Sequence, residues 1–228
     1  MIDLPGLAIY DMHFRKSPKK LYVHDEFGPK VEMPIQYYFR SYYHMPELER
    51  KAIGLCQGEI LEIGAGAGAH ALELQRQGKE ITALEISPLA CEVMAHRGVT
   101  NVINEDIFNY SQSKFDTLLL LMNGIGLCGT IEGLHRFLDH VKNLLKPNGR
   151  LVFDSCDIMY MYESSPLPDN YYGEARVRYE YKDLKTNWFN WLYIDFDTLE
   201  EECKNLGWEA ILISEDNSNQ YLASLRLL

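Results

Sequence analysis

The chain has 228 residues and a formal net charge of −11, from 22 basic and 33 acidic residues. With 46% hydrophobic and 24% charged residues, its composition is that of a soluble globular protein and excludes intrinsic disorder. The longest apolar run, residues 118–122, is far too short to cross a membrane. So negative a charge repels phosphate backbones, which makes nucleic acid an unfavourable partner.

The cysteines and histidines indicate neither a disulfide framework nor a metal site. The five cysteines are odd in number and form no CxxC pair. The N-terminus does not have the pattern of a secretory signal. We therefore expect buried free thiols in a reducing compartment, and a cytoplasmic protein. His135 and His140 do not form an HExxH pattern, so we expect no metal.

The distribution of apolar residues along the chain changes near Pro46. Residues 1–45 contain several prolines and a dense aromatic stretch, which predict an irregular N-terminal arm or lid. From Pro46, short apolar runs alternate with helical patterns, which predicts crossover units and a parallel sheet covered on both faces. Helices are expected at 47–53, 67–77, 88–97 and 131–145, and strands at 60–63, 81–85, 102–103, 115–122 and 151–153.

The alternation breaks after the fifth strand. A loop rich in tyrosine and proline over 158–172 leads into two alternating segments, 175–181 and 188–196, which predict an antiparallel hairpin. A helix beginning at Asp197 and two final strands at 208–214 and 220–227 complete the chain. Residues 158–196 are therefore interpreted as an insertion.

A glycine loop is the strongest chemical signal. The expected strand 60–63 is followed by Gly64, Gly66 and Gly68 and then by a helix. Glycine permits positive φ angles and lets the backbone approach a ligand closely. Gly64, Gly66 and Ala69 also fit the dinucleotide pattern, with Glu85 at the distance of a ribose-binding acid. An NAD(P)-dependent oxidoreductase is therefore one interpretation.

Further motifs, in order, resemble those of the class I S-adenosylmethionine-dependent methyltransferases. Glu62 precedes the three glycines, Glu85 ends the second strand, and Asp106 follows the third. Residues 144–152 are similar to the family's turn into its fifth strand. The resemblance implies a Rossmann-like α/β domain over 46–228, in three layers, interrupted by the insertion 158–196. It also implies a seven-stranded sheet in order 3-2-1-4-5-7-6, with only the last strand antiparallel.

The resemblance also implies how S-adenosylmethionine is held. Glu85 would bind both ribose hydroxyls, Asp106 the adenine amino group, and Ile86 the adenine face, while Glu62 would orient the methionine amino end. The implied cofactor-binding residues are Glu62, Gly64, Ala65, Gly66, Gly68, Glu85, Ile86, Asp106, Ile107, Met122 and Asn123.

Two residues of the aromatic stretch are added as candidates. Arg40 can hold the cofactor carboxylate, and Tyr43 can close over the sulfonium by a cation–π contact. Simple packing of the arm on the sheet is the alternative.

The methyl acceptor is less defined. Methyl transfer mainly requires alignment, so we assign no catalytic residue. The sequence after the fourth strand, Asn123-Gly124-Ile125-Gly126, differs from the Pro-Pro-aromatic pattern of enzymes that methylate amino groups of nucleic-acid bases. We expect a small-molecule acceptor, with a protein acceptor as an alternative. A non-catalytic S-adenosylmethionine-binding module is another alternative, and the insertion is either a substrate cover or a contact in a homodimer.

Overall fold

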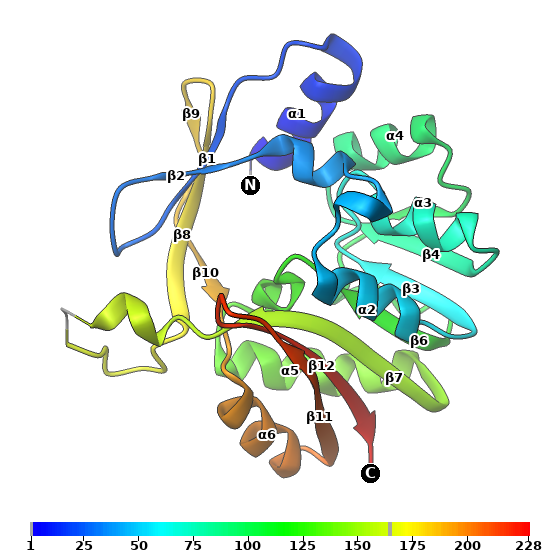
Figure 1. Ribbon diagram of the computed structural model, residues 1–228, viewed down its shortest axis with the longest axis vertical. Coiled ribbons are helices and arrows are strands. Elements are labelled where there is room, and N and C mark those ends of the chain that lie inside the picture. The colour runs from blue at the N-terminus through cyan, green and yellow to red at the C-terminus, as the bar shows by residue number, and fades with distance from the viewer. Residues whose placement is uncertain (1, 164–165) are drawn as a thin grey trace.

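The computed structural model describes residues 2–163 and 166–228 and arranges them around two sheets (Figure 1). Residue 1 of the predicted arm and residues 164–165 of the predicted insertion lie outside the described residues. Within the described ranges, no helix has the length and apolarity that a membrane crossing requires. The five cysteines all lie in these ranges and are free thiols, and four of them are buried.

The larger sheet confirms the predicted topology. Its seven strands are ordered β11-β12-β7-β6-β3-β4-β5, which is the order 3-2-1-4-5-7-6 when they are numbered along the chain. Only β12 runs antiparallel to its neighbours. The strands are β3 (Glu59–Ile63), β4 (Glu80–Glu85), β5 (Val102–Asn104), β6 (Phe115–Leu120), β7 (Leu145–Cys156), β11 (Trp208–Glu215) and β12 (Gln220–Leu227).

Helices cover both faces of this sheet, and each face has its own hydrophobic cluster. Leu134 and Phe137 of α5 and Leu199 of α6 pack on one face, whereas α2, α3 and α4 pack on the other. The helices are α2 (Glu47–Leu55), α3 (Ala69–Arg76), α4 (Pro88–Arg97), α5 (Ile131–Val141) and α6 (Phe196–Asn205).

Several predicted helix boundaries are wrong. α2 continues through Gly54 to Leu55, and α3 covers Ala69–Arg76 rather than 67–77. α6 begins at Phe196 rather than Asp197, because the side chain of Asp195 accepts the backbone N–H of Thr198 and caps the helix. α5 ends at Val141, and a 3₁₀ turn follows it. β7 then begins at Leu145, which already pairs with β6, and the strand bulges before the regular pairing resumes.

The N-terminal arm is ordered, which corrects the expectation of an irregular segment. It forms α1 (Leu4–Tyr10), a π-helical turn at Asp11–Arg15, β1 (Leu21–His24), β2 (Val31–Met33) and 3₁₀ turns at Ile35–Phe39 and Tyr42–His44. These elements are too short for a clear periodicity, so their order comes from tertiary pairing. Leu4, Ala8 and Ile9 of α1 are buried in a cluster that includes Val93 of α4.

The second sheet joins the arm to the insertion. Its strands are ordered β10-β8-β1-β2, and β9 also pairs with β8. The predicted hairpin is present as β8 (Glu174–Tyr181) and β10 (Phe189–Leu192), with β9 (Leu184–Lys185) beside them. β1 pairs antiparallel with β8, so that Leu21 lies opposite Tyr181. Figure 1 shows this second sheet standing beyond the carboxyl ends of the central parallel strands.

Candidate functional site

The glycine loop follows β3 and has the backbone conformation that its composition predicts. Gly64, Gly66 and Gly68 have φ angles of +75°, +57° and +77°, which other residues adopt only with strain. At Gly66 space is also limiting, because a β-carbon there would stand 2.9 Å from Cδ1 of Tyr38. The loop therefore lies under a side chain of the N-terminal arm.

Glu85 ends β4 with its carboxylate facing this loop. Its Oε2 accepts the N–H of Gly66 at 2.8 Å, and its Oε1 accepts the N–H of Ser87 at 2.9 Å. Burial raises the pKa of Glu85, and these two backbone hydrogen bonds oppose the shift. Each carboxylate oxygen has a second lone pair. Glu85 can therefore still accept a pair of ligand hydroxyls.

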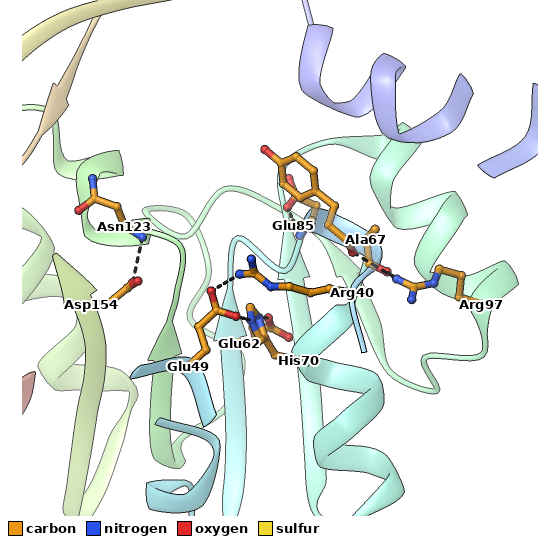
Figure 2. A network of polar contacts seen from close by, with 11 residues as sticks. Arg40, Glu49, Glu62, Ala67, His70, Glu85, Arg97, Asn123 and Asp154 are labelled. Atoms are coloured by element: carbon orange, nitrogen blue, oxygen red, sulfur yellow. Dashed lines mark hydrogen bonds and ion pairs between the residues drawn. The ribbon is translucent and has the colours of Figure 1, made fainter. Parts of the chain in front are cut away.

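Four buried charged side chains form a chain beside the loop (Figure 2). The imidazole of His70 lies between two carboxylates, with Nδ1 2.9 Å from Glu62 Oε1 and Nε2 3.0 Å from Glu49 Oε2. The other oxygen of Glu49 pairs with Arg40. The network thus links the arm, α2, α3 and the end of β3.

His70 carries a positive charge at neutral pH. Burial alone would lower the pKa of His70, but the hydrogen bonds that its ring donates to Glu49 and Glu62, with the negative charges of these carboxylates, outweigh burial and raise the pKa to about 9. Two positive and two negative groups therefore balance within the network. Sequence reasoning missed Glu49 and His70. His70 directly follows the glycine motif, but the partner on α2 is recognisable only in the folded chain.

Several buried polar atoms at this edge of the sheet have no hydrogen-bond partner within the described residues. They are Oε2 of Glu62, Nε of Arg40, and both side-chain atoms of Asn123. Buried polar groups are normally paired, so unpaired ones require an explanation. An α-amino-acid group supplies the missing partners, because its ammonium can donate to Glu62 and its carboxylate can accept from Arg40. The residues present therefore fit the methionine end of S-adenosylmethionine.

Asn123 and Asp154 join the ends of β6 and β7. The backbone N–H of Asn123, in a left-handed conformation with φ +55°, donates to Asp154 Oδ1 at 2.9 Å. Burial raises the pKa of Asp154 to about 7, although the hydrogen bond from Asn123 opposes the shift. The adjacent Met122 also has a positive φ of +61°.

The remaining predicted site residues differ in their exposure and in their contacts. Ile86 is 65% exposed directly after β4, and Asp106 accepts the N–H of Phe108 at 3.0 Å. Ala65 and Ile107 are buried. Tyr43 is 87% exposed and packs edge-on against Tyr42. It is Tyr38, not singled out by the sequence, that covers the loop.

Comparisons with known proteins agree on one family. A family model described as a methyltransferase domain matches residues 61–153. The crystal structure of a SAM-dependent methyltransferase from Bacteroides fragilis, in complex with S-adenosyl-L-homocysteine, is 41% identical and superposes with a TM-score of 0.92. That match covers 99% of this chain and 94% of the other.

Curated relatives match a shorter region. Demethylmenaquinone methyltransferase from Tropheryma whipplei (strain Twist) is 28% identical over 108 residues, which is 45% of this chain and 44% of the relative. The mitochondrial ubiquinone biosynthesis O-methyltransferase of Schizosaccharomyces pombe is 28% identical over 116 residues, 49% of this chain and 42% of the relative. The chain thus spans less than half the length of these two relatives.

Proposed function

The chain belongs to the class I S-adenosylmethionine-dependent methyltransferases, and we propose that it transfers the methyl group of S-adenosylmethionine to a small molecule bound between its two sheets. The observation that carries the proposal is the set of groups at the carboxyl edge. Glu85 faces the glycine loop, and Glu62 and Arg40 have buried polar atoms that find no partner among residues 2–163 and 166–228. Family membership also removes the oxidoreductase interpretation of the glycine pattern.

In this proposal each cofactor group has a residue to bind it. Glu85 accepts the ribose hydroxyls, Glu62 accepts the ammonium, and the Arg40 guanidinium donates to the carboxylate. The adenine lies between Ile86 and the segment at Asp106. The bound cofactor supplies a methyl group activated by a sulfonium, and the chain's residues orient it and exclude water.

The second sheet supports a small acceptor. Together, residues 10–45 and the described parts of the insertion, 158–163 and 166–196, form the cover that we propose for the acceptor side, because ligands of open α/β sheets bind beyond the carboxyl ends of the strands. Ala175 and Val177 of β8 are buried on one face of this sheet. The names of two curated relatives refer to demethylmenaquinone and to ubiquinone biosynthesis, which agrees with an acceptor that is not a macromolecule. A dimer contact at the insertion is the alternative.

The experiment compares the thermal stability of the protein with S-adenosylhomocysteine and with NAD. A ligand at about 100 times its Kd adds about 2.7 kcal/mol to the free energy of unfolding. We expect stabilisation by S-adenosylhomocysteine alone, and stabilisation by NAD alone would overturn the proposal. Labelled S-adenosylmethionine incubated with a metabolite extract then tests turnover. Absence of any labelled product would favour a non-catalytic binding module.

A further inference from the structure

We propose that Asp154 is the catalytic base of this enzyme and that it binds, together with the side chain of Asn123, a neutral hydroxyl group on an aromatic acceptor. The inference rests on the proposed function and adds the class of acceptor and the residue that takes its proton. It begins from the pair of residues at the ends of β6 and β7.

Asn123 follows β6, the neighbour of the strand that carries the glycine loop, and Asp154 lies on β7, one strand further along the sheet. β6 lies between β3 and β7 in the sheet, so the ends of these strands meet at one edge. Asp154 is 7% exposed, and one of its oxygens is held by the N–H of Asn123. Figure 2 shows the pair on the far side of Glu49 from Glu85. This is the side left for an acceptor when the ribose is at Glu85.

The side chain of Asn123 supplies one donor and one acceptor that remain unused. Its Nδ2 and Oδ1 are both buried without a hydrogen-bond partner in the described part of the chain. Leaving such groups unpaired destabilises the folded protein, because they have lost their hydrogen bonds to water. A ligand hydroxyl can accept from Nδ2 while it donates to Asp154, and a neighbouring polar group of the ligand can pair with Oδ1. The site therefore matches a ligand with adjacent polar groups.

The charges around Asp154 favour a neutral acceptor. The titratable groups that face it are Glu49 on α2 and His70 on α3, and these belong to the balanced network. On β12 its opposite residue is Leu222, and β6 ends in leucines. The carboxylate of Asp154 thus offsets the positive sulfonium, whereas a cationic acceptor would add a second positive charge beside it.

A hydroxyl is the acceptor that needs this carboxylate. As the oxygen–carbon bond forms, the sulfur–carbon bond breaks with its electron pair left on sulfur, and the hydroxyl proton passes to Asp154. The products are a methyl ether, S-adenosylhomocysteine and a neutral carboxylic acid. A neutral amine carries a free lone pair and can attack without prior proton removal. A pKa of about 7 leaves Asp154 partly ionised at neutral pH and able to act as this base.

Aromatic side chains beside the turn that follows Asn123 favour a planar acceptor. Trp191 of β10 lies against Gly126, where a β-carbon would stand 2.0 Å from the indole Nε1. Gly126 closely follows Asn123 in the chain. Tyr193 packs in the same cluster as Trp191. Flat rings stack well on such residues, so we infer a phenol or catechol as the acceptor class.

The first test measures binding in solution. Catechol is titrated into the complex with S-adenosylhomocysteine, with 2-phenylethylamine as the amine probe. We expect the wild type to bind catechol, and Asp154→Asn and Asn123→Gly to weaken it by about tenfold or more. Glycine is chosen at Asn123 because it keeps the positive φ. Asp139→Asn, the same change on the exposed surface of α5, is the matched control and should bind as the wild type does.

The outcomes of the binding test separate a failure of the proposed function from a failure of the further inference. If the wild-type protein does not bind S-adenosylhomocysteine, the proposed function itself is overturned. If that ligand binds, the further inference is overturned by any of three results: no binding of catechol, preferential binding of the amine, or unchanged catechol affinity in both variants.

The second test measures turnover of whichever phenol binds. Asp154→Asn should lower kcat about 100- to 1,000-fold, while its affinity for S-adenosylhomocysteine stays within about threefold of the wild type. The wild-type kcat should rise with pH up to about 7 and then level off, and the residual activity of the variant should not follow pH in this way. A wild-type rate and pH profile in the variant would exclude Asp154 as the base.

Discussion

The ring of Tyr38 lies over Gly66, so closely that a β-carbon on the glycine would stand 2.9 Å from Tyr38 Cδ1. Tyr38 belongs to the N-terminal arm, and Gly66 is the middle glycine of the loop after β3. The same loop residue donates its N–H to Glu85. The arm therefore closes on the backbone that we expect to contact the cofactor, and Tyr38 limits the size of residue 66.

Gly66→Ala is expected to abolish most binding of S-adenosylhomocysteine. The φ of +57° costs an alanine about 1–2 kcal/mol, and its methyl group must also displace Tyr38. Isothermal titration measures the affinity, and urea unfolding measures the stability. Gly54→Ala is the matched control, because Gly54 lies in α2 with open space around it. That variant should gain about 0.5–1 kcal/mol. Wild-type affinity in Gly66→Ala would contradict the assignment of the loop.

Glu85→Ala should remove most of the cofactor affinity. The loss of both ribose acceptors is expected to cost about 2–4 kcal/mol of binding free energy. The carboxylate also accepts the N–H groups of Gly66 and Ser87, so its removal can disturb the loop as well. Glu85→Gln is therefore measured as a second variant, because it retains one acceptor oxygen in a side chain of the same shape. We expect an intermediate affinity for it. Binding by Glu85→Ala within about threefold of wild type would show that Glu85 does not hold the ribose.

The protonation of His70 should make stability fall at alkaline pH. Its pKa is raised from 6.5 to about 9 in the folded protein. The resulting stabilisation is fully present below about pH 6.5 and is lost as the pH rises through about 9. The size of this contribution is about 3 kcal/mol. The ¹⁵N shifts of the His70 ring should report the imidazolium form at pH 8, while denaturant unfolding follows the decline in stability. A neutral ring at pH 7.5 would rule out the charged bridge.

Tyr181→Phe should loosen the π-helical turn of the arm from β8. The hydroxyl of Tyr181 donates to Asp11 Oδ2 at 2.8 Å, and Asp11 is 1% exposed. Removal of a hydrogen bond to a buried carboxylate costs about 1–3 kcal/mol. The measurements are urea unfolding and the rate of proteolysis in residues 1–45.

The control for this prediction is Tyr22→Phe. Tyr22 follows Leu21, the partner of Tyr181, so its side chain lies on the opposite face of β1. Removing the Tyr22 hydroxyl should change the free energy of unfolding by less than about 0.5 kcal/mol. Equal effects of the two substitutions would mean that the contact with Asp11 does not hold the arm.

The sequence by itself determined the features that depend on neighbouring residues. Alternating apolar runs and helical patterns predicted a parallel sheet covered on both faces, and the resemblance to the class I methyltransferases implied its seven strands and their order. The structure confirms both. The helix expected at 88–97 is present as α4, and the Ser87 side chain caps it by accepting the N–H of Ala90. The glycine loop and Glu85 were visible because each is a motif within a few residues of a strand end.

Only the tertiary structure decided how distant segments meet. β1 and β8 pair although one comes from the arm and the other from the insertion, and neither strand has a pattern that specifies its partner. His70 obtains its charge from Glu49, and Asp154 obtains its altered acidity from burial at the end of β7. Such properties depend on desolvation and on charges brought close by folding. They have no local signature, because the same residues in an unfolded chain would be surrounded by water.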